Sequence, residues 1–220
     1  VRVNLLHREG ETTVEDDKRR TTAASIGLDY RGERLRSSLD VGYQKKTFHG
    51  GSMGVNISNI DFVPAVPGNS KNTSQKWAWS DIENEFGLAR AEYDVTDIWT
   101  AYAAFGGQHS HEQGVYGGPK VINAAGDATI GRLDTNRISD SWSGMAGLRG
   151  NFDTGPVSHK VNVGYSASIK QDKVAWRMSS KNPLVNIYNN SAVPMPDYSL
   201  TGGNYSDPLT TGRNRTQGWL

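Results

Sequence analysis

The sequence contains no cysteine and no run of 18 or more consecutive apolar residues. Without cysteine there are no disulfides and no thiolate metal sites. Without a long apolar run there is no transmembrane helix. The low mean hydropathy, −0.61, is nevertheless compatible with a membrane location, because the strands of a transmembrane barrel alternate apolar and polar residues.

An excess of charge of one sign is also missing, since 24 basic residues balance 23 acidic ones. Such a balance creates no bulk field that would attract nucleic acid, so we expect no nucleic-acid partner. The sequence has no Gly-x-Ser-x-Gly motif, no glycine-rich phosphate loop and no pair of carboxylates spaced for acid–base chemistry. We therefore expect a protein that is not an enzyme.

What the sequence does contain is a repeated strand pattern, clearest in Phe86–Gln108. After the polar turn at Asp94–Asp97, apolar or small residues alternate with polar ones, and this period of two is typical of β-strands. A short turn between two strands requires antiparallel pairing. Similar alternation recurs in residues 1–8, 24–30, 35–43, 142–152 and 161–169. The pattern predicts an all-β fold, an antiparallel up-and-down meander of about seven to eight strands.

The segment before this turn is less regular, because its apolar residues change parity between Phe86/Leu88 and Ala89/Ala91. We expect a β-bulge there or burial on both faces.

The connections between the strands alternate in length. Short turns are expected at 31–34, 94–98 and 153–157, and long loops at 9–20, 48–76, 113–136 and 178–216. Four aromatic residues stand beside the short turns on the apolar face: Tyr30, Tyr93, Trp99 and Phe152. Short turns at one end, long loops at the other and aromatic residues at the short end are typical of an outer-membrane β-barrel.

Two other architectures fit part of this pattern. A soluble β-sandwich would explain the alternation, and it predicts that Leu39, Val41, Val161 and Val163 are buried in a core. It would not explain why the long loops lie at one end. A passive porin would share both the alternation and the loop lengths.

Specific motifs favour a receptor over a porin. Ala91–Thr100, the turn Gly150–Tyr165 with its Thr-Gly-Pro-Val-x-His sequence, and Asn186-Ile-Tyr-Asn189 resemble TonB-dependent siderophore receptors. The resemblance is greatest to the branch that takes up ferrichrome and related hydroxamate siderophores, and it extends over essentially the whole chain.

The resemblance implies a segment of a 22-stranded transmembrane β-barrel in the bacterial outer membrane. Residues 1–220 would form part of the barrel domain, with the plug and the remaining strands absent, and both ends of the chain interpreted as cuts. The implied partners are a ferric siderophore, outer-membrane lipid, and TonB through the absent plug. No cofactor and no protein metal ligand are expected, because the siderophore already fills the coordination sphere of the iron.

Five residues are candidates for siderophore binding, which requires aromatic side chains and a few hydrogen-bond donors at the barrel mouth. Tyr116 matches a ligand-contacting tyrosine segment of ferrichrome-type receptors, although glycine stands at position 118 where those receptors have a second aromatic residue. The other four lie where long loops meet strands, and each fits either a ligand platform or the outer aromatic girdle: Trp77, Trp79, Trp176 and Arg177.

Two further groups of polar residues stand out. His109 and His111 would share a strand face near Glu112, but no third metal ligand is evident from the spacing, so exposed histidines are the favoured interpretation. Charged residues on the polar face would line the barrel lumen, where they would contact the plug or water: Arg36, Asp40, Arg90, Glu92, Arg149, Lys160 and Lys170.

Overall fold

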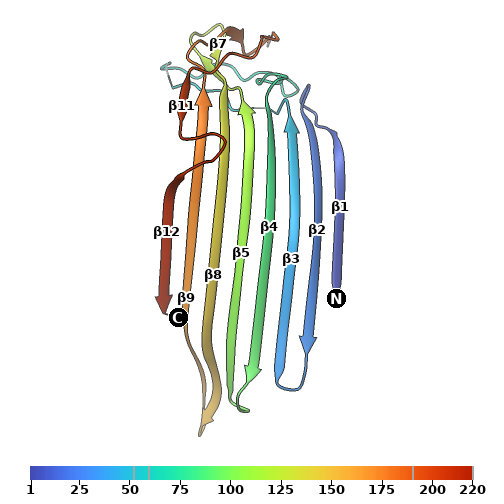
Figure 1. Cartoon of the computed structure of the whole chain (residues 1–220), viewed down its shortest axis with the longest axis vertical. Coiled ribbons are helices and arrows are strands. Elements are labelled where there is room, and N and C mark those ends of the chain that lie inside the picture. Colours follow the sequence, from blue (N-terminus) through green and yellow to red (C-terminus); the bar gives the residue numbers. More distant parts are fainter. Residues whose placement is uncertain (52, 59, 190, 220) are drawn as a thin grey trace.

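The computed structural model describes residues 1–51, 53–58, 60–189 and 191–219. A nine-stranded antiparallel sheet runs in the order β1-β2-β3-β4-β5-β8-β9-β11, and β12 also pairs with β9 (Figure 1). Its strands are β1 (Arg2–Glu11), β2 (Lys18–Arg31), β3 (Leu35–His49), β4 (Trp79–Asp94), β5 (Trp99–Tyr116), β8 (Leu133–Thr154), β9 (Val157–Met178), β11 (Leu200–Gly202) and β12 (Thr210–Trp219). The predicted meander is confirmed. No described segment forms a helix able to cross a membrane.

The register assigns every strand residue to one of two faces, because residues directly opposite each other in neighbouring strands point the same way. Leu39 lies opposite Leu28 on one side and Ala89 on the other. The next residue, Asp40, lies opposite Gly27 and Leu88. We call the first set the apolar face and the second the polar face.

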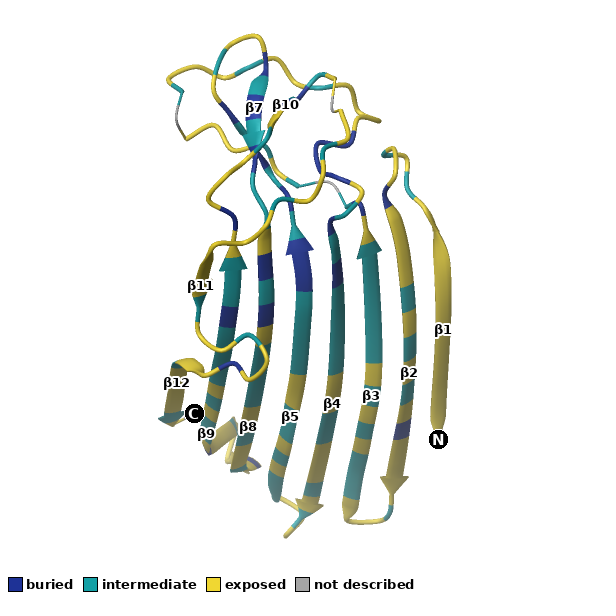
Figure 2. Ribbon diagram, turned by 45° about the horizontal axis from the view of Figure 1, so that its top comes forward, coloured by how far each residue is buried: buried dark blue, intermediate teal, exposed yellow. Residues whose placement is uncertain are grey.

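The apolar face of the sheet is uncovered along most of its length in the described structure, although at the loop end the chain around Tyr205 covers Asn136 and Ala175. Leu39 and Val41 are each 43% exposed, and Val163 is 57% exposed. The β-sandwich prediction of a core at these residues is therefore wrong. The described sheet is a single layer (Figure 2), and large apolar side chains on this face are exposed to solvent.

Neither expectation for β4 is met. The register with both neighbours is continuous through residues 79–93, so there is no bulge, and Phe86 and Ala89 are both exposed, so neither face is buried there. The change of parity has a different cause. Phe86 and Leu88 lie on the polar face, because they are opposite Gly42 and Asp40, whereas Ala89 lies on the apolar face.

Many glycines are explained by large rings on the neighbouring strand. The Trp99 ring lies over Gly150, where an added Cβ would be 2.7 Å from the ring. Trp142 lies in the same way over Gly107, and Phe86 over Gly42. A ring that lies flat on the sheet needs a position without a side chain beneath it, which glycine provides.

The short turns and their aromatic residues are placed as predicted. Tyr30 and Tyr93 are about half exposed on the apolar face. Trp99 and Phe152 form a tilted pair with ring centroids 6.3 Å apart at the same end of the sheet.

The charged segment 9–20 is not one long loop as predicted, since β1 continues to Glu11 and β2 begins at Lys18. Opposite charges meet across the two strands and allow them to extend. Arg20 bonds Glu9 at 2.7 Å, and Lys18 lies 3.1 Å from Glu11.

The long connections at the other end form a compact unit, which we call the loop cap: the described residues of 50–78, 117–132 and 179–199. They were predicted to be irregular, but they contain a second sheet of β6 (Pro119–Val121), β7 (Asp127–Ile130) and β10 (Leu184–Asn186), in the order β10-β7-β6. Its core consists of Val121, Ala128, Ile130, Val185 and Ile187. The cap and the adjoining strand ends hold most of the buried residues (Figure 2).

Candidate siderophore-binding end of the sheet

Tyr116 is the last residue of β5, on the polar face directly below the loop cap. Its hydroxyl donates a hydrogen bond to Glu112 Oε1 at 2.6 Å. The ring lies back over Gly114, where an added Cβ would be 2.7 Å from it. Glu112, Gly114 and Tyr116 share one face because they alternate along the strand. The ring therefore lies along the sheet, with its hydroxyl already engaged.

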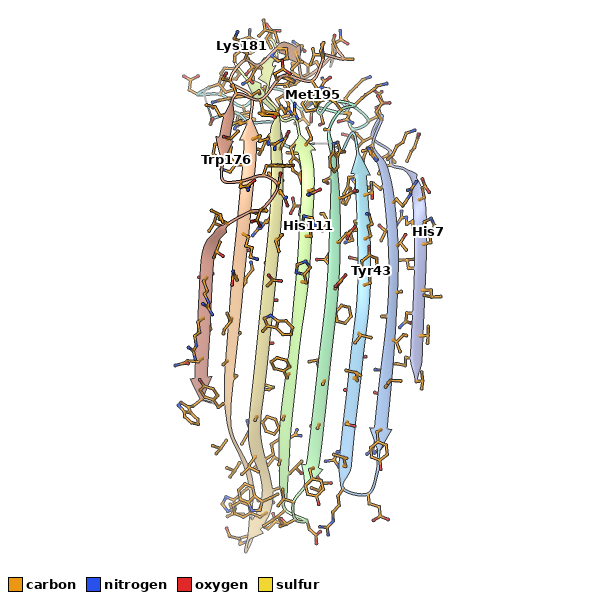
Figure 3. All side chains as sticks on the ribbon, in the orientation of Figure 1. His7, Tyr43, His111, Trp176, Lys181 and Met195 are labelled. Carbon is orange, nitrogen blue, oxygen red and sulfur yellow. The ribbon has the colours of Figure 1, made fainter. Side chains whose placement is uncertain are left out.

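Trp176 shares this face with Tyr116. Gly114 is opposite Thr135 of β8, and Thr135 is opposite Trp176 of β9. The two aromatic candidates thus stand on strands two apart, about 10 Å between backbones. The indole lies over Gly202 of β11 near the loop end of the sheet (Figure 3).

Charged side chains occupy the polar face just below these two rings. Arg137 lies opposite Glu112 and bonds Asp172 at 3.2 Å. Lys170 also lies 3.3 Å from Asp172. Aromatic rings with hydrogen-bonding charges beneath them suit a bulky polar ligand. Reasoning from the sequence missed Arg137, Asp172 and Glu112 as parts of this site, although strict alternation places all three on the polar face.

Arg177 is not part of this surface. It follows Trp176 on a strand, so it lies on the opposite face, across from Asp134. Its guanidinium stacks on the ring of Tyr205 at 4.2 Å and on that of Tyr198 at 4.9 Å. Burial and the nearby Asp134 carboxylate raise the pKa of Tyr205. Arg177 thus holds Tyr198 and Tyr205, which lie on either side of β11, on the apolar face of the sheet.

Trp79 also lies away from the polar face, and Trp77 lies outside the strands. β4 begins only at Trp79, which lies on the apolar face opposite His49 and Val115. This position fits the aromatic girdle rather than a ligand platform. Trp77 precedes the strand, and its ring lies over Gly117, directly after Tyr116. Its indole N–H donates to the Val193 carbonyl at 3.1 Å.

The two histidines share a face as expected, but Glu112 points to the other side. His109 bonds Asp140 at 2.6 Å, and His111 bonds Asn136 at 2.9 Å. No group of three metal-ligating side chains occurs among the residues that the structure describes.

The predicted polar-face charges share one face, and several form ion pairs near the short turns. Arg36 makes two bonds of 2.7 Å to Asp94. Arg149 bonds Glu92 and stacks over Tyr102 at 5.2 Å. This second polar cluster lies at the end of the sheet opposite the loop cap.

A known protein matches almost the whole chain. The chain is 47% identical over 218 residues to the ferrichrome receptor FcuA of Yersinia enterocolitica, a match that covers 99% of this chain and 28% of that receptor. The predicted resemblance to siderophore receptors is confirmed. The chain spans 28% of the length of FcuA. No family model matches the chain.

Solved structures show the same fold. The ferric preacinetobactin receptor BauA of Acinetobacter baumannii superposes with a TM-score of 0.80 at 23% identity, covering 98% of this chain and 32% of that one. The outer-membrane ferripyoverdine receptor of Pseudomonas aeruginosa, bound to ferripyoverdine, gives a TM-score of 0.76 at 15% identity, covering 99% and 29%. The meander of this chain is thus the fold of a segment of these receptors.

Proposed function

We propose that this chain forms part of the wall and outer loops of a bacterial outer-membrane receptor for a ferric siderophore, with a hydroxamate siderophore favoured. The observation that carries the proposal is the identity of 47% to a ferrichrome receptor along 99% of the chain. The role of the protein is binding and uptake rather than catalysis.

The two faces of the sheet have different surroundings in this proposal. The apolar face, with its belt of rings beside the short turns, contacts the hydrocarbon of the membrane. The polar face lines the lumen of the closed barrel. Because β8 and β9 are each 22 residues long, they extend beyond the roughly 9–11 residues that cross a bilayer, toward the loop cap.

The ligand is held at the loop end of the lumen, where Tyr116 and Trp176 present aromatic surface above Arg137 and Asp172. The siderophore brings iron with its coordination sphere filled, so the protein supplies neither a metal ligand nor a cofactor. Uptake is driven by TonB through a plug domain elsewhere in the receptor.

Ligand binding by the intact receptor tests this proposal. Tryptophan fluorescence is titrated with ferrichrome and, in parallel, with a ferric catecholate. Saturable quenching by ferrichrome alone supports a hydroxamate receptor. Saturable quenching by the catecholate alone would contradict the hydroxamate assignment. A separate uptake assay tests the porin alternative, which would be favoured by uptake that stays linear in ligand concentration and independent of TonB.

A further inference from the structure

A run of buried polar residues stands just before β4. Asn72, Thr73, Ser74 and Gln75 are each between 2% and 9% exposed, although none lies in a strand. Burying polar side chains is unfavourable unless hydrogen bonds compensate. Four in succession therefore point to a specific set of partners.

The first three side chains each reach a different part of the chain. Asn72 donates through Nδ2 to the carbonyl of Glu15, in the β1–β2 turn, at 2.8 Å, and also to that of Gly50. Thr73 Oγ1 donates to the carbonyl of Met53 at 2.7 Å. Ser74 Oγ donates to the carbonyl of Gly117 at 3.0 Å, and Gly117 directly follows Tyr116.

Gln75 and Trp77 hold the third connection. The Gln75 side chain donates to the Ser191 carbonyl at 3.1 Å and accepts from the Val193 amide at 3.0 Å. Trp77 donates to the Val193 carbonyl at 3.1 Å. These bonds imitate strand pairing, but side chains replace one of the two backbones.

We propose that residues 72–77 are a hub that holds the four connections at the loop end of the sheet together as one body: β1–β2, β3–β4, β5–β8 and the connection that follows β9. Within this hub, Ser74 is a positioning residue for the turn after Tyr116. Every bond described above joins a hub side chain to a main-chain group, which belongs either to another connection or, at Gly50 and Met53, to the start of the hub's own connection. The hub therefore sets where each loop lies, whatever side chains that loop carries. The mechanical part stands on these contacts alone, whereas the link to ligand binding rests on the proposed function.

Hydrogen exchange of the intact receptor without ligand tests the hub. Gln75→Ala removes two hydrogen bonds and is expected to speed amide exchange in residues 191–195 by about tenfold. Ser74→Ala is expected to act on residues 117–121 and Thr73→Val on residues 53–56, each leaving the other loops near their wild-type rates.

Lys76→Ala is the matched control from within the same segment. Lys76 is exposed, and its ion pair with Asp16 at 3.3 Å is on the surface. Unchanged exchange in residues 191–195 of Gln75→Ala would overturn the hub. So would an equal acceleration in every strand, which would indicate general destabilisation.

A second measurement addresses the link to the ligand. Ferrichrome titration of Ser74→Ala is expected to show several-fold weaker binding than Lys76→Ala, because the turn after Tyr116 loses its anchor. Equal binding by the two variants would refute the positioning role of Ser74. If the wild-type receptor binds no siderophore, the proposed function fails, and the exchange experiment still decides the hub.

Discussion

The loop cap offers a quantitative test, because its core, among the residues that the structure describes, consists of five buried hydrophobic residues. Ile130 of β7 is completely buried there. Ile130→Ala removes three carbon groups, each worth about 0.8 kcal/mol of burial, which gives roughly 2.4 kcal/mol before any cavity cost. Measured changes of this kind cover about 2–5 kcal/mol. Even a loss of about 2 kcal/mol raises the equilibrium constant for opening of the cap by about 30-fold.

Amide hydrogen exchange of the intact receptor measures this opening directly. The amides of β6, β7 and β10 are expected to exchange at least tenfold faster in Ile130→Ala, whereas the centres of β5 and β8 keep their wild-type rates. Val66→Ala is the control, because Val66 lies in the cap but is 85% exposed. A change of less than twofold in Ile130→Ala would refute the conclusion that these residues hold the cap together.

Three further predictions concern the site, the sheet and the cap. Tyr116→Phe is expected to keep siderophore affinity within about twofold, because Glu112 already engages the hydroxyl, whereas Tyr116→Ala is expected to weaken binding about tenfold because the ring is lost. An equal loss of affinity in both variants would contradict a contact between the ring face and the ligand. Gly150→Ala is expected to lower the free energy of unfolding by about 1–3 kcal/mol, measured as a lowered Tm, because the new Cβ meets the Trp99 ring. Gly212→Ala, with open space at its Cβ, is the control, and an equal Tm in the two variants would disprove the clash. Hydrogen bonds from Asn123 and Asn186 lower the pKa of Asp127 below its ordinary 3.8, so this carboxylate stabilises the cap above that pH and the contribution disappears as the pH falls through the lowered value. Cap exchange in Asp127→Asn should therefore depend less on acid than in wild type, and identical acid profiles would argue against this role.

Strand positions and faces were predictable from the sequence because alternation reports directly on which side chains share a face. The clearest case is β3, where Leu39 and Val41 alternate with Asp40 and Gly42 and both faces were assigned correctly. The aromatic belt followed from the same parity. Trp176 was also correctly placed at the loop end, because alternation and the position of the long loop were both readable.

Other features depend on contacts that no local pattern encodes. β12 begins at Thr210 and is almost entirely polar, so only its pairing with β9 makes it a strand. The strands of the loop cap are three or four residues long, too short for a period of two to stand out. The role of Arg177 was missed because its partners, Tyr198 and Tyr205, come from a distant loop.

The rings that lie on glycines also determine how neighbouring strands can align during assembly. A slip of one residue is forbidden because it would turn the apolar side chains of a strand to the wrong face. A slip of two residues would preserve the faces, but it would place the Trp142 ring opposite Phe105 or His109 instead of Gly107. Each ring–glycine pair thus sterically favours one alignment of its two strands. Such pairs disfavour the two-residue slip, which the distribution of apolar and polar residues alone would allow.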